Sequence, residues 1–264
     1  MYNFAYHRPD SVDAAKSVFS GGDDPKFVAG GMTLIPTMKQ RLAAPSDLID
    51  LDGIGALKGI KAEADKIIVG AMTTHADVAA SPEIRKAIPA LAKLVEAIGD
   101  PQVRNRGTIG GSIANNDPAA DYPAALVGLG ATVVTDRRQL AAEDFFTGLF
   151  ETALEPDELI TEVSFPIPEA AGYAKFANPA SRYAIVGVFV ARTGGGVRVA
   201  VTGAGPCVFR VPEMEKALAS SFSADAVKDI KVSDSDFNSD IHASAPYRAH
   251  LVTVMARRAV EAAQ

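Results

Sequence analysis

The sequence is poor in the residues from which metal clusters and disulfide-bonded folds are built. It contains no tryptophan, and Cys207 is the only cysteine among 264 residues. A single cysteine cannot form a disulfide within the chain, nor can it supply the cysteine ligands of an iron–sulfur cluster. The four histidines show no H-E-x-x-H spacing. We therefore expect no metal site on this chain.

Positive charge and long apolar runs are also scarce. The 26 basic residues are outnumbered by 32 acidic ones, which gives a net charge of −6 and argues against a nucleic-acid-binding surface. No apolar run approaches the ~18 residues that a membrane span needs. The first residues lack the basic and then apolar segments of a secretion signal. We expect a cytoplasmic protein that binds no nucleic acid and spans no membrane.

The composition is that of a globular protein with more than one domain. Hydrophobic residues make up 48% of the chain and charged residues 22%, which excludes general disorder. At ~150 residues per domain, the length indicates about two domains. The segment Pro-Ile-Pro-Glu-Ala-Ala-Gly at 166–172 interrupts both helical and strand periodicity. It predicts a domain boundary there.

Local patterns predict a mixture of helices and strands. Asp10 or Ser11 is placed to cap a first helix that ends at Gly21-Gly22, and Thr74 with Asp77 predicts another helix start. Further helical stretches are expected over 84–98, 118–129, 211–219 and 246–263. Strands are expected over 26–29, 66–71, 131–135, 139–141, 159–165, 184–192 and 197–202.

Two glycine pairs are the candidate ligand-binding motifs of the sequence. Gly30-Gly31 follows a predicted strand, and Gly110-Gly111 lies further along the chain. Glycine permits the positive φ and the close backbone approach that a phosphate-binding turn requires. Thr33, Thr108 and Ser112 add hydroxyl groups beside the two turns. Two such turns could hold the two phosphates of a dinucleotide from opposite sides, although either pair alone is also typical of an ordinary tight turn.

The common nucleotide-binding motifs are missing. Neither turn carries the lysine of a P-loop, and the start of a G-x-G-x-x-G motif at Gly203 has Val208 in place of its third glycine. Asp121 follows the second turn and is a candidate to accept hydrogen bonds from ribose or ribitol hydroxyls. Helix capping is its alternative role.

Four short motifs, taken in order, resemble a known family. They read AGGMTLIP at 29–36, GAMTT at 70–74, RGTIGGS at 106–112 and DPAAD at 117–121. Together they are similar to the FAD-binding medium subunit of molybdenum hydroxylases, a family that includes the carbon monoxide dehydrogenase medium chain and the FAD domain of xanthine dehydrogenase. The resemblance runs from about residue 6 to residue 258.

The resemblance implies an α+β fold. A two-subdomain FAD-binding domain of the PCMH type would occupy residues 1–168, with subdomains of about 1–52 and 53–168. A small α/β C-terminal domain over residues 169–264 would follow and close on the flavin.

The resemblance also implies a cofactor site for FAD and no catalytic residue on this chain. Carried over to this sequence, the pyrophosphate region would be held by Ala29, Gly30, Gly31, Met32, Thr33 and Leu34, and by Thr108, Gly110, Gly111 and Ser112. Asn115 and Asp121 would touch the ribityl or ribose part. Leu159 or Ile160 would pack on the flavin or the adenine, Lys175 would approach the polar edge of the flavin ring, and Tyr183 would lie by its face.

The implied function is electron transfer within a heterotrimer. The chain would pass electrons from the [2Fe-2S] clusters of a small partner subunit through FAD to an external acceptor, while a large molybdopterin subunit oxidises the substrate. Two alternatives stay open, a self-sufficient FAD-dependent oxidase or reductase and a non-catalytic nucleotide-binding module. The substrate and the acceptor cannot be read from this sequence, because the substrate would bind a different polypeptide.

Overall fold

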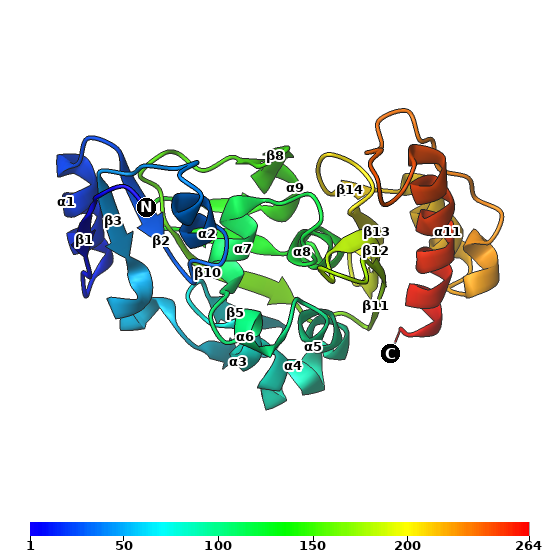
Figure 1. Cartoon of the computed structure of the whole chain (residues 1–264). Coiled ribbons are helices and arrows are strands. Elements are labelled where there is room, and N and C mark those ends of the chain that lie inside the picture. Colours follow the sequence, from blue (N-terminus) through cyan, green and yellow to red (C-terminus); the bar gives the residue numbers. More distant parts are fainter. Residues whose placement is uncertain (264) are drawn as a thin grey trace.

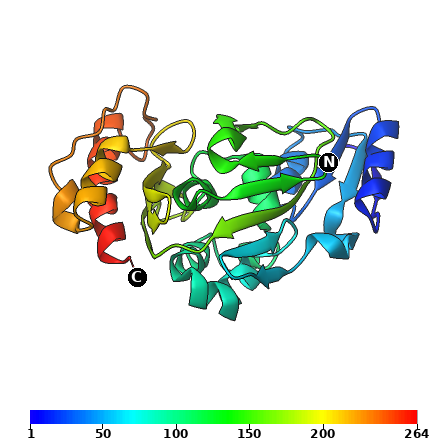
Figure 2. The same cartoon turned by 180° about the vertical axis from the view of Figure 1, so that it is seen from behind.

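The computed structural model describes residues 1–263, which form three main sheets in a row with helices packed on them (Figures 1 and 2). We name the parts after these sheets: the N-terminal lobe (residues 1–50), the middle lobe (58–166) and the C-terminal lobe (170–263). The N-terminus and the C-terminus of the described chain lie in the first and the last of these lobes (Figure 1).

The N-terminal lobe is a small parallel sheet with helices. Its strands follow the spatial order β1-β3-β2. The Ser11 side chain caps α1 as predicted, accepting a hydrogen bond from the Ala14 N–H. Its elements are β1 (Ala5–His7), α1 (Val12–Gly21), β2 (Pro25–Val28), α2 (Leu34–Lys39) and β3 (Asp47–Asp50), and the short 3-10 turns Leu51–Gly53 and Gly55–Leu57 lead out of it.

The middle lobe is built on an antiparallel sheet of order β4-β5-β10-β6-β7. The inward side chains of β5, β6 and β10 form one apolar core with α3, α5, α7 and α8. The elements are β4 (Ile60–Ala62), β5 (Lys66–Gly70), α3 (His75–Ala80), α4 (Pro82–Ala87), α5 (Pro89–Glu96), α6 (Pro101–Arg104), α7 (Ile109–Asn115), α8 (Tyr122–Leu129), β6 (Thr132–Thr135), β7 (Gln139–Ala141), α9 (Ala142–Phe145), β8 (Phe146–Gly148), β9 (Glu151–Thr152) and β10 (Ile160–Pro166).

The C-terminal lobe is a four-stranded antiparallel sheet between two helices. Every residue of α8 is buried, because this helix lies between the middle lobe and strands β12 and β13. The other face is covered by α11, which approaches so closely that a Cβ on Gly172 would lie 1.9 Å from the Ala259 carbonyl oxygen. The elements are β11 (Ala170–Ala177), β12 (Ala184–Thr193), β13 (Gly196–Thr202), β14 (Phe209–Arg210), α10 (Pro212–Ser220), the 3-10 turn Ala224–Val227 and α11 (Ala245–Glu261).

Two sequence-based element predictions are wrong in detail, and several strands were not predicted. The helix expected over 84–98 is two helices, because Pro89 cannot continue α4 and begins α5. The helix expected to start at Pro118 starts at Tyr122, and the Pro118 carbonyl instead accepts hydrogen bonds from β13 and the residue after it. Strand β11 was not predicted, because its pairing with β12 is tertiary and Gly172 weakens its local pattern.

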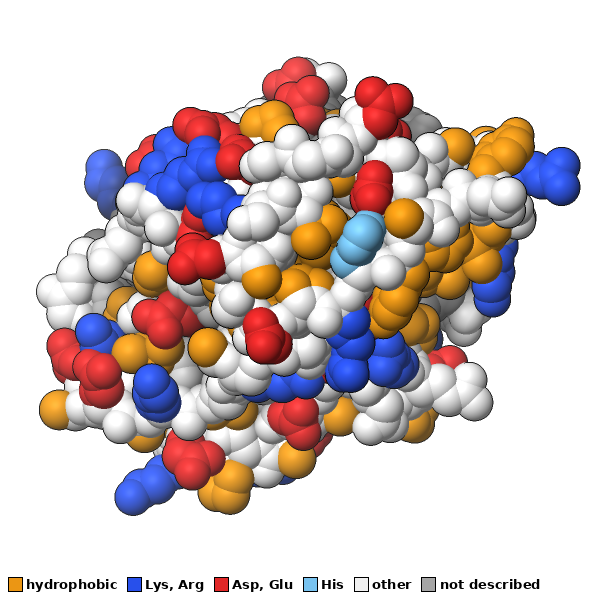
Figure 3. All heavy atoms as spheres, turned by 90° about the vertical axis from the view of Figure 1, so that its left-hand side faces the viewer, with side chains coloured by type: hydrophobic (Ala, Val, Ile, Leu, Met, Phe, Trp, Pro, Cys, Tyr) orange, Lys and Arg blue, Asp and Glu red, His pale blue; other side chains and the backbone are white. Residues whose placement is uncertain are grey.

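The surface has no large region of one charge on the side of the N-terminal lobe. Acidic, basic and apolar side chains are interspersed there (Figure 3). None of the helices within residues 1–263 combines the length and the apolar character needed to cross a bilayer.

Candidate functional site

A cavity of about 810 Å³ lies between the N-terminal and middle lobes and reaches the connection between β11 and β12 of the C-terminal lobe. This volume is within the range typical of cofactor sites. The predicted cofactor residues line it with one exception: Ala29, Gly30, Gly31, Met32, Thr33, Leu34, Thr108, Gly110, Gly111, Ser112, Asn115, Asp121, Leu159, Ile160 and Tyr183 are in its wall, and Lys175 is not.

The two glycine turns meet at this cavity although they come from different lobes. A Cβ atom on Gly30 would lie 2.0 Å from the carbonyl oxygen of Arg106, and one on Gly111 would lie 3.1 Å from the Cβ of Ala29. Gly31 has φ = +73°, in the left-handed region that glycine adopts freely. The absence of side chains is therefore what lets the two backbone segments touch.

The first turn offers four consecutive free backbone donors. The N–H groups of Gly30, Gly31, Met32 and Thr33 have no acceptor within residues 1–263. In the second turn the N–H of Gly110 donates to the Ala71 carbonyl at 2.8 Å. The glycine pair of the second turn is therefore not a source of free N–H donors, and its part in phosphate binding stays a prediction.

The second turn instead opens helix α7. Its N–H groups from Ile109 to Ser112 are bonded within the protein, whereas the Thr108 N–H has no acceptor within residues 1–263. The N–H of Ile109 donates to Thr73, and the N–H of Gly111 donates to the Thr108 hydroxyl, which caps the helix. Ser112 contributes a hydroxyl to the cavity wall from the same helical turn. The second turn supplies close backbone approach and hydroxyl groups, and the first supplies N–H donors.

Asp121 lies in the cavity wall with its carboxylate already bound by two side chains. It accepts hydrogen bonds from the Tyr173 hydroxyl and from the Lys175 ammonium, the latter at 3.0 Å. Lys175 also donates to the Ala97 carbonyl at 2.8 Å. Burial raises the pKa of Asp121, and the adjacent ammonium and hydroxyl oppose that rise. Lys175 thus acts behind the wall, because Asp121 stands between it and the cavity.

The remaining predicted residues form apolar and aromatic parts of the wall. Leu159 and Ile160 are buried at the start of β10, whereas Tyr183 is 46% exposed and precedes β12. Met32 is also partly exposed at the first turn. The wall therefore contains both buried aliphatic side chains and a partly exposed aromatic ring.

His75 is a cavity residue that was not among the predicted cofactor residues. Its side chain is 5% exposed, and Nδ1 has no hydrogen-bond partner within the described chain. Burial, with a smaller effect from Arg104, lowers the pKa of His75 to about 4. The imidazole is therefore neutral at pH 7. Its position directly after Thr74, which caps α3, was a signal for its placement.

Phe19 and Phe27 form an aromatic part of the cavity wall that the sequence did not predict. Their rings stack with centroids 4.6 Å apart, and both side chains line the cavity. One residue lies on α1 and the other on β2, so only the packing of helix on sheet brings them together. No local motif marks such a pair.

The residues present suit FAD. A cavity of this volume, whose wall contains a turn of free N–H donors, hydroxyl groups and apolar and aromatic side chains, suits a dinucleotide with two ring systems. The free donors are the specific observation, because backbone N–H groups without an acceptor bind phosphate oxygens.

Comparisons with known proteins agree with this geometry. Residues 2–168 match the family described as the FAD-binding domain in molybdopterin dehydrogenase. The chain is 37% identical to the nicotine 6-hydroxylase medium subunit of Paenarthrobacter nicotinovorans, covering 97% of this chain and 95% of the relative. It is 35% identical to the carbon monoxide dehydrogenase medium chain of Hydrogenophaga pseudoflava, covering 98% and 96%.

Solved structures of such enzymes show the same fold. A carbon monoxide dehydrogenase chain from Hydrogenophaga pseudoflava superposes with a TM-score of 0.88 at 36% identity, covering 98% of this chain and 96% of that one. A chain of quinoline 2-oxidoreductase from Pseudomonas putida 86 has the same TM-score at 30% identity, covering 98% and 96%. The resemblance, the α+β fold class and the FAD cofactor expected from the sequence are confirmed. The chain belongs to the family of FAD-binding medium subunits of molybdenum hydroxylases.

Proposed function

We propose that the cavity between the lobes holds FAD in an extended form, with its pyrophosphate at the first glycine turn. The free N–H groups of residues 30–33 support this placement. Gly110 and Gly111 would let the phosphates approach the backbone from the other side, with the hydroxyl groups of Thr108 and Ser112 nearby. The single observation that carries the proposal is the contact of the two turns beside these free donors.

The other predicted residues would hold the remaining parts of the cofactor. Asn115 and Asp121 would bind hydroxyls of the ribityl or ribose part, Leu159 or Ile160 would pack on a ring, and Tyr183 would lie at the flavin face. Lys175 would act on the flavin site through Asp121, whose carboxylate it holds. We also keep the predicted division into domains at 1–168 and 169–264, with subdomains 1–52 and 53–168.

We further propose that this subunit is the electron exit of a three-subunit complex. When bound, FAD supplies the capacity to accept and release electrons. With one cysteine, this chain needs partners for the other redox centres. A small [2Fe-2S] subunit and a large molybdopterin subunit are the proposed partners, an external acceptor is the proposed destination, and the cytoplasm is the proposed location.

Purification under mild conditions tests this function. A flavin absorption spectrum, with co-purification of an iron–sulfur protein and a large molybdoprotein, is the expected result. A flavin-containing chain that oxidises substrate alone would support the self-sufficient oxidase or reductase instead. A colourless protein would indicate a nucleotide-binding module without redox function.

A pair of glycine variants tests the pyrophosphate placement. Gly31 and Gly196 both have positive φ, +73° and +112°, so alanine is strained in the backbone at either position. A Cβ on Gly31 would meet Ile35 at 2.8 Å in the first turn, whereas Gly196 has open space in the β12–β13 hairpin. We expect Gly31→Ala to lose FAD and Gly196→Ala to retain it. Equal FAD content in both variants would contradict the placement.

A further inference from the structure

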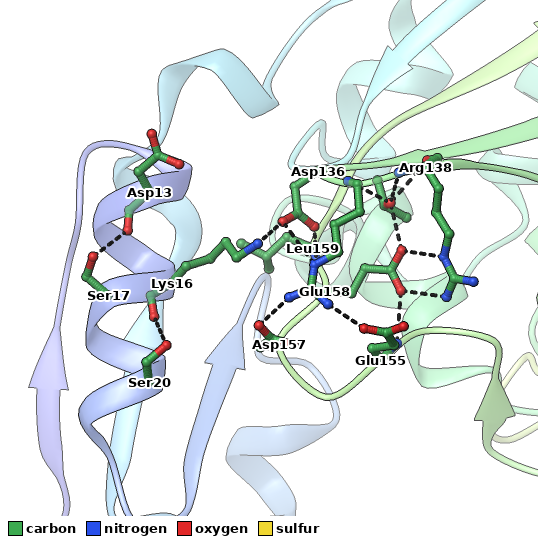
Figure 4. A network of polar contacts seen from close by, with 12 residues as sticks. Asp13, Lys16, Ser17, Ser20, Asp136, Arg138, Glu155, Asp157, Glu158 and Leu159 are labelled. Carbon is green, nitrogen blue, oxygen red and sulfur yellow. Dashed lines mark hydrogen bonds and ion pairs between the residues drawn. The ribbon is translucent and has the colours of Figure 1, made fainter.

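Within residues 1–263, one polar contact links the N-terminal lobe to the lobes beyond residue 58, while Arg8 also pairs with Asp52 in the connecting segment 51–57. Among residues 1–263, the ion pair between the Lys16 ammonium and the Asp136 carboxylate is the only salt bridge or hydrogen bond that links residues 1–50 to any residue beyond 58. Lys16 lies on α1, and Asp136 lies in the turn between β6 and β7 (Figure 4). The other contacts between the N-terminal and middle lobes are apolar or backbone packing.

Asp136 also forms hydrogen bonds with Leu159, a residue of the cavity wall. Its Oδ1 accepts the N–H of Leu159 at 2.9 Å, and its own N–H donates to the Leu159 carbonyl at the same distance. Leu159 is 4% exposed and packs into the apolar cluster of the N-terminal lobe, which includes Ala15, the neighbour of Lys16. The ion pair and the apolar contact of Leu159 therefore join the same two lobes at the same place.

The two residues after Asp136 hold the rest of this wall. Arg137 binds the carboxylates of Glu155 and Asp157. Arg138 binds Glu158 through two hydrogen bonds of 2.9 and 2.8 Å (Figure 4). The β6–β7 turn thus anchors the whole segment from residue 153 to residue 159, most of which lines the cavity.

The ion pair is partly shielded from water. The side chain of Asp136 is 7% exposed and that of Lys16 is 27% exposed. Arg137 lies 3.8 Å from the same carboxylate, so Asp136 keeps a cationic neighbour if Lys16 is neutralised. Replacing Lys16 therefore removes the ion pair between the lobes, while the buried Asp136 carboxylate keeps Arg137 as a cationic neighbour.

We propose that Lys16 and Asp136 are positioning residues that keep the N-terminal lobe against the cavity and thereby slow the release of FAD. This inference rests on the proposed location of FAD between the lobes. The N-terminal lobe carries the first glycine turn and Phe19, so its movement away from Leu159 opens the cavity along one side. Neither Lys16 nor Asp136 lines the cavity, and their effect passes through Leu159 and α1.

The test measures the rate at which FAD leaves the holoprotein, isolated with any subunits that copurify, from the rise in flavin fluorescence. Lys16→Met removes the charge and keeps an unbranched side chain of similar length. We expect FAD to leave this variant about threefold to tenfold faster at low salt. Lys16→Arg should keep the parent rate. Lys66→Met is the control, because Lys66 forms an exposed ion pair with Glu63 remote from the cavity.

Salt and a second variant distinguish this role from general loss of stability. At ~1 M salt, where screening acts within ~3 Å, the parent rate should approach that of Lys16→Met. Asp136→Asn keeps an oxygen for the Leu159 N–H, and it should match Lys16→Met. The double variant should be no faster than either single one, as expected for partners in one interaction.

Several outcomes would overturn the proposal. Equal release from the parent and Lys16→Met, additive effects in the double variant, or the same acceleration in Lys66→Met each exclude a specific role of the ion pair. If the parent holds FAD firmly in any of these cases, the function of the subunit stands and only this inference fails. A parent protein without FAD overturns both.

Discussion

The backbone at Gly30 packs directly against the carbonyl oxygen of Arg106, at a point where a Cβ atom would lie only 2.0 Å from that oxygen. Neither partner is a flexible side chain, so the contact cannot be relieved without moving one of the two turns. The close approach of the two turns at the FAD cavity depends on this glycine.

Gly30→Ala should therefore push the first turn away from the second. We expect FAD affinity to fall by at least about tenfold, because overpacking a rigid contact costs about 1–3 kcal/mol. Titration of the apoprotein with FAD, followed by flavin fluorescence quenching, measures the change. Gly55→Ala is the matched control, since a Cβ there has nothing within 4 Å. Unchanged affinity in Gly30→Ala would show that the turns need not touch to hold the cofactor.

Because Lys175 and Asp121 form a buried ion pair, we expect substitutions of the two residues to have strongly coupled effects on the free energy of unfolding. Both side chains are almost fully buried. Lys175→Met leaves the Asp121 carboxylate without its cation, and we expect the free energy of unfolding to fall by about 3–5 kcal/mol. Urea titration measures this loss.

The double variant Lys175→Met with Asp121→Asn supplies the control for that prediction. Because it removes both charges, it should recover most of the lost stability. A double variant less stable than Lys175→Met would contradict the coupling and indicate that the lysine acts through the Ala97 carbonyl alone.

The lowered pKa of His75 predicts that the free energy of unfolding decreases in mildly acidic solution. Its folded-state pKa is lowered from 6.5 to about 4, mainly because burial disfavours the imidazolium. Between these values the unfolded chain binds a proton that the folded chain does not, so stability decreases as the pH falls from 6.5 to about 4. The decrease is on the order of 3 kcal/mol. His75→Gln should lack this decrease in urea titrations at pH 7.5, 6 and 5, and parallel curves for parent and variant would contradict the prediction.

Glu158 predicts a separate loss of stability at lower pH. The Arg138 hydrogen bonds, with smaller help from the Glu155 N–H and the Thr135 hydroxyl, lower its pKa from 4.5 to about 2 against the effect of burial. Its stabilising contribution is present above pH 4.5 and is lost as the pH falls from there through about 2. We expect the parent to exceed Glu158→Gln by on the order of 2–3 kcal/mol at pH 7.

That difference should shrink below pH 4.5, which circular dichroism of urea unfolding at pH 5, 4 and 3 would follow. Glu169→Gln is the control, because Glu169 pairs with Arg192 at an exposed position. If the parent and Glu158→Gln differ by the same amount at every pH, the carboxylate charge is not what stabilises the wall segment.

Signals that act within a few residues were read correctly from the sequence. Ser11 and Thr74 cap the helices that they were expected to cap, since a cap is a contact with a backbone N–H three residues away. The glycine turns and the family motifs were also visible, because close backbone approach leaves no choice but glycine. The cavity wall therefore contains nearly all of the expected residues, and their individual contacts with FAD stay predictions.

The features that local patterns did not predict depend on contacts between residues that lie far apart in the chain. The N–H groups of Ile109 and Gly110 donate to Thr73 and Ala71 in the segment between β5 and α3, and no motif in 106–112 encodes that contact. Lys175 faces Asp121 rather than the cavity because β11 pairs with β12 next to α8. The ion pair of Lys16 and Asp136 likewise exists only once the lobes are assembled. Short-range hydrogen bonds and glycine conformations follow from the local sequence. The partner of a buried charge depends on the tertiary packing that removes that charge from water.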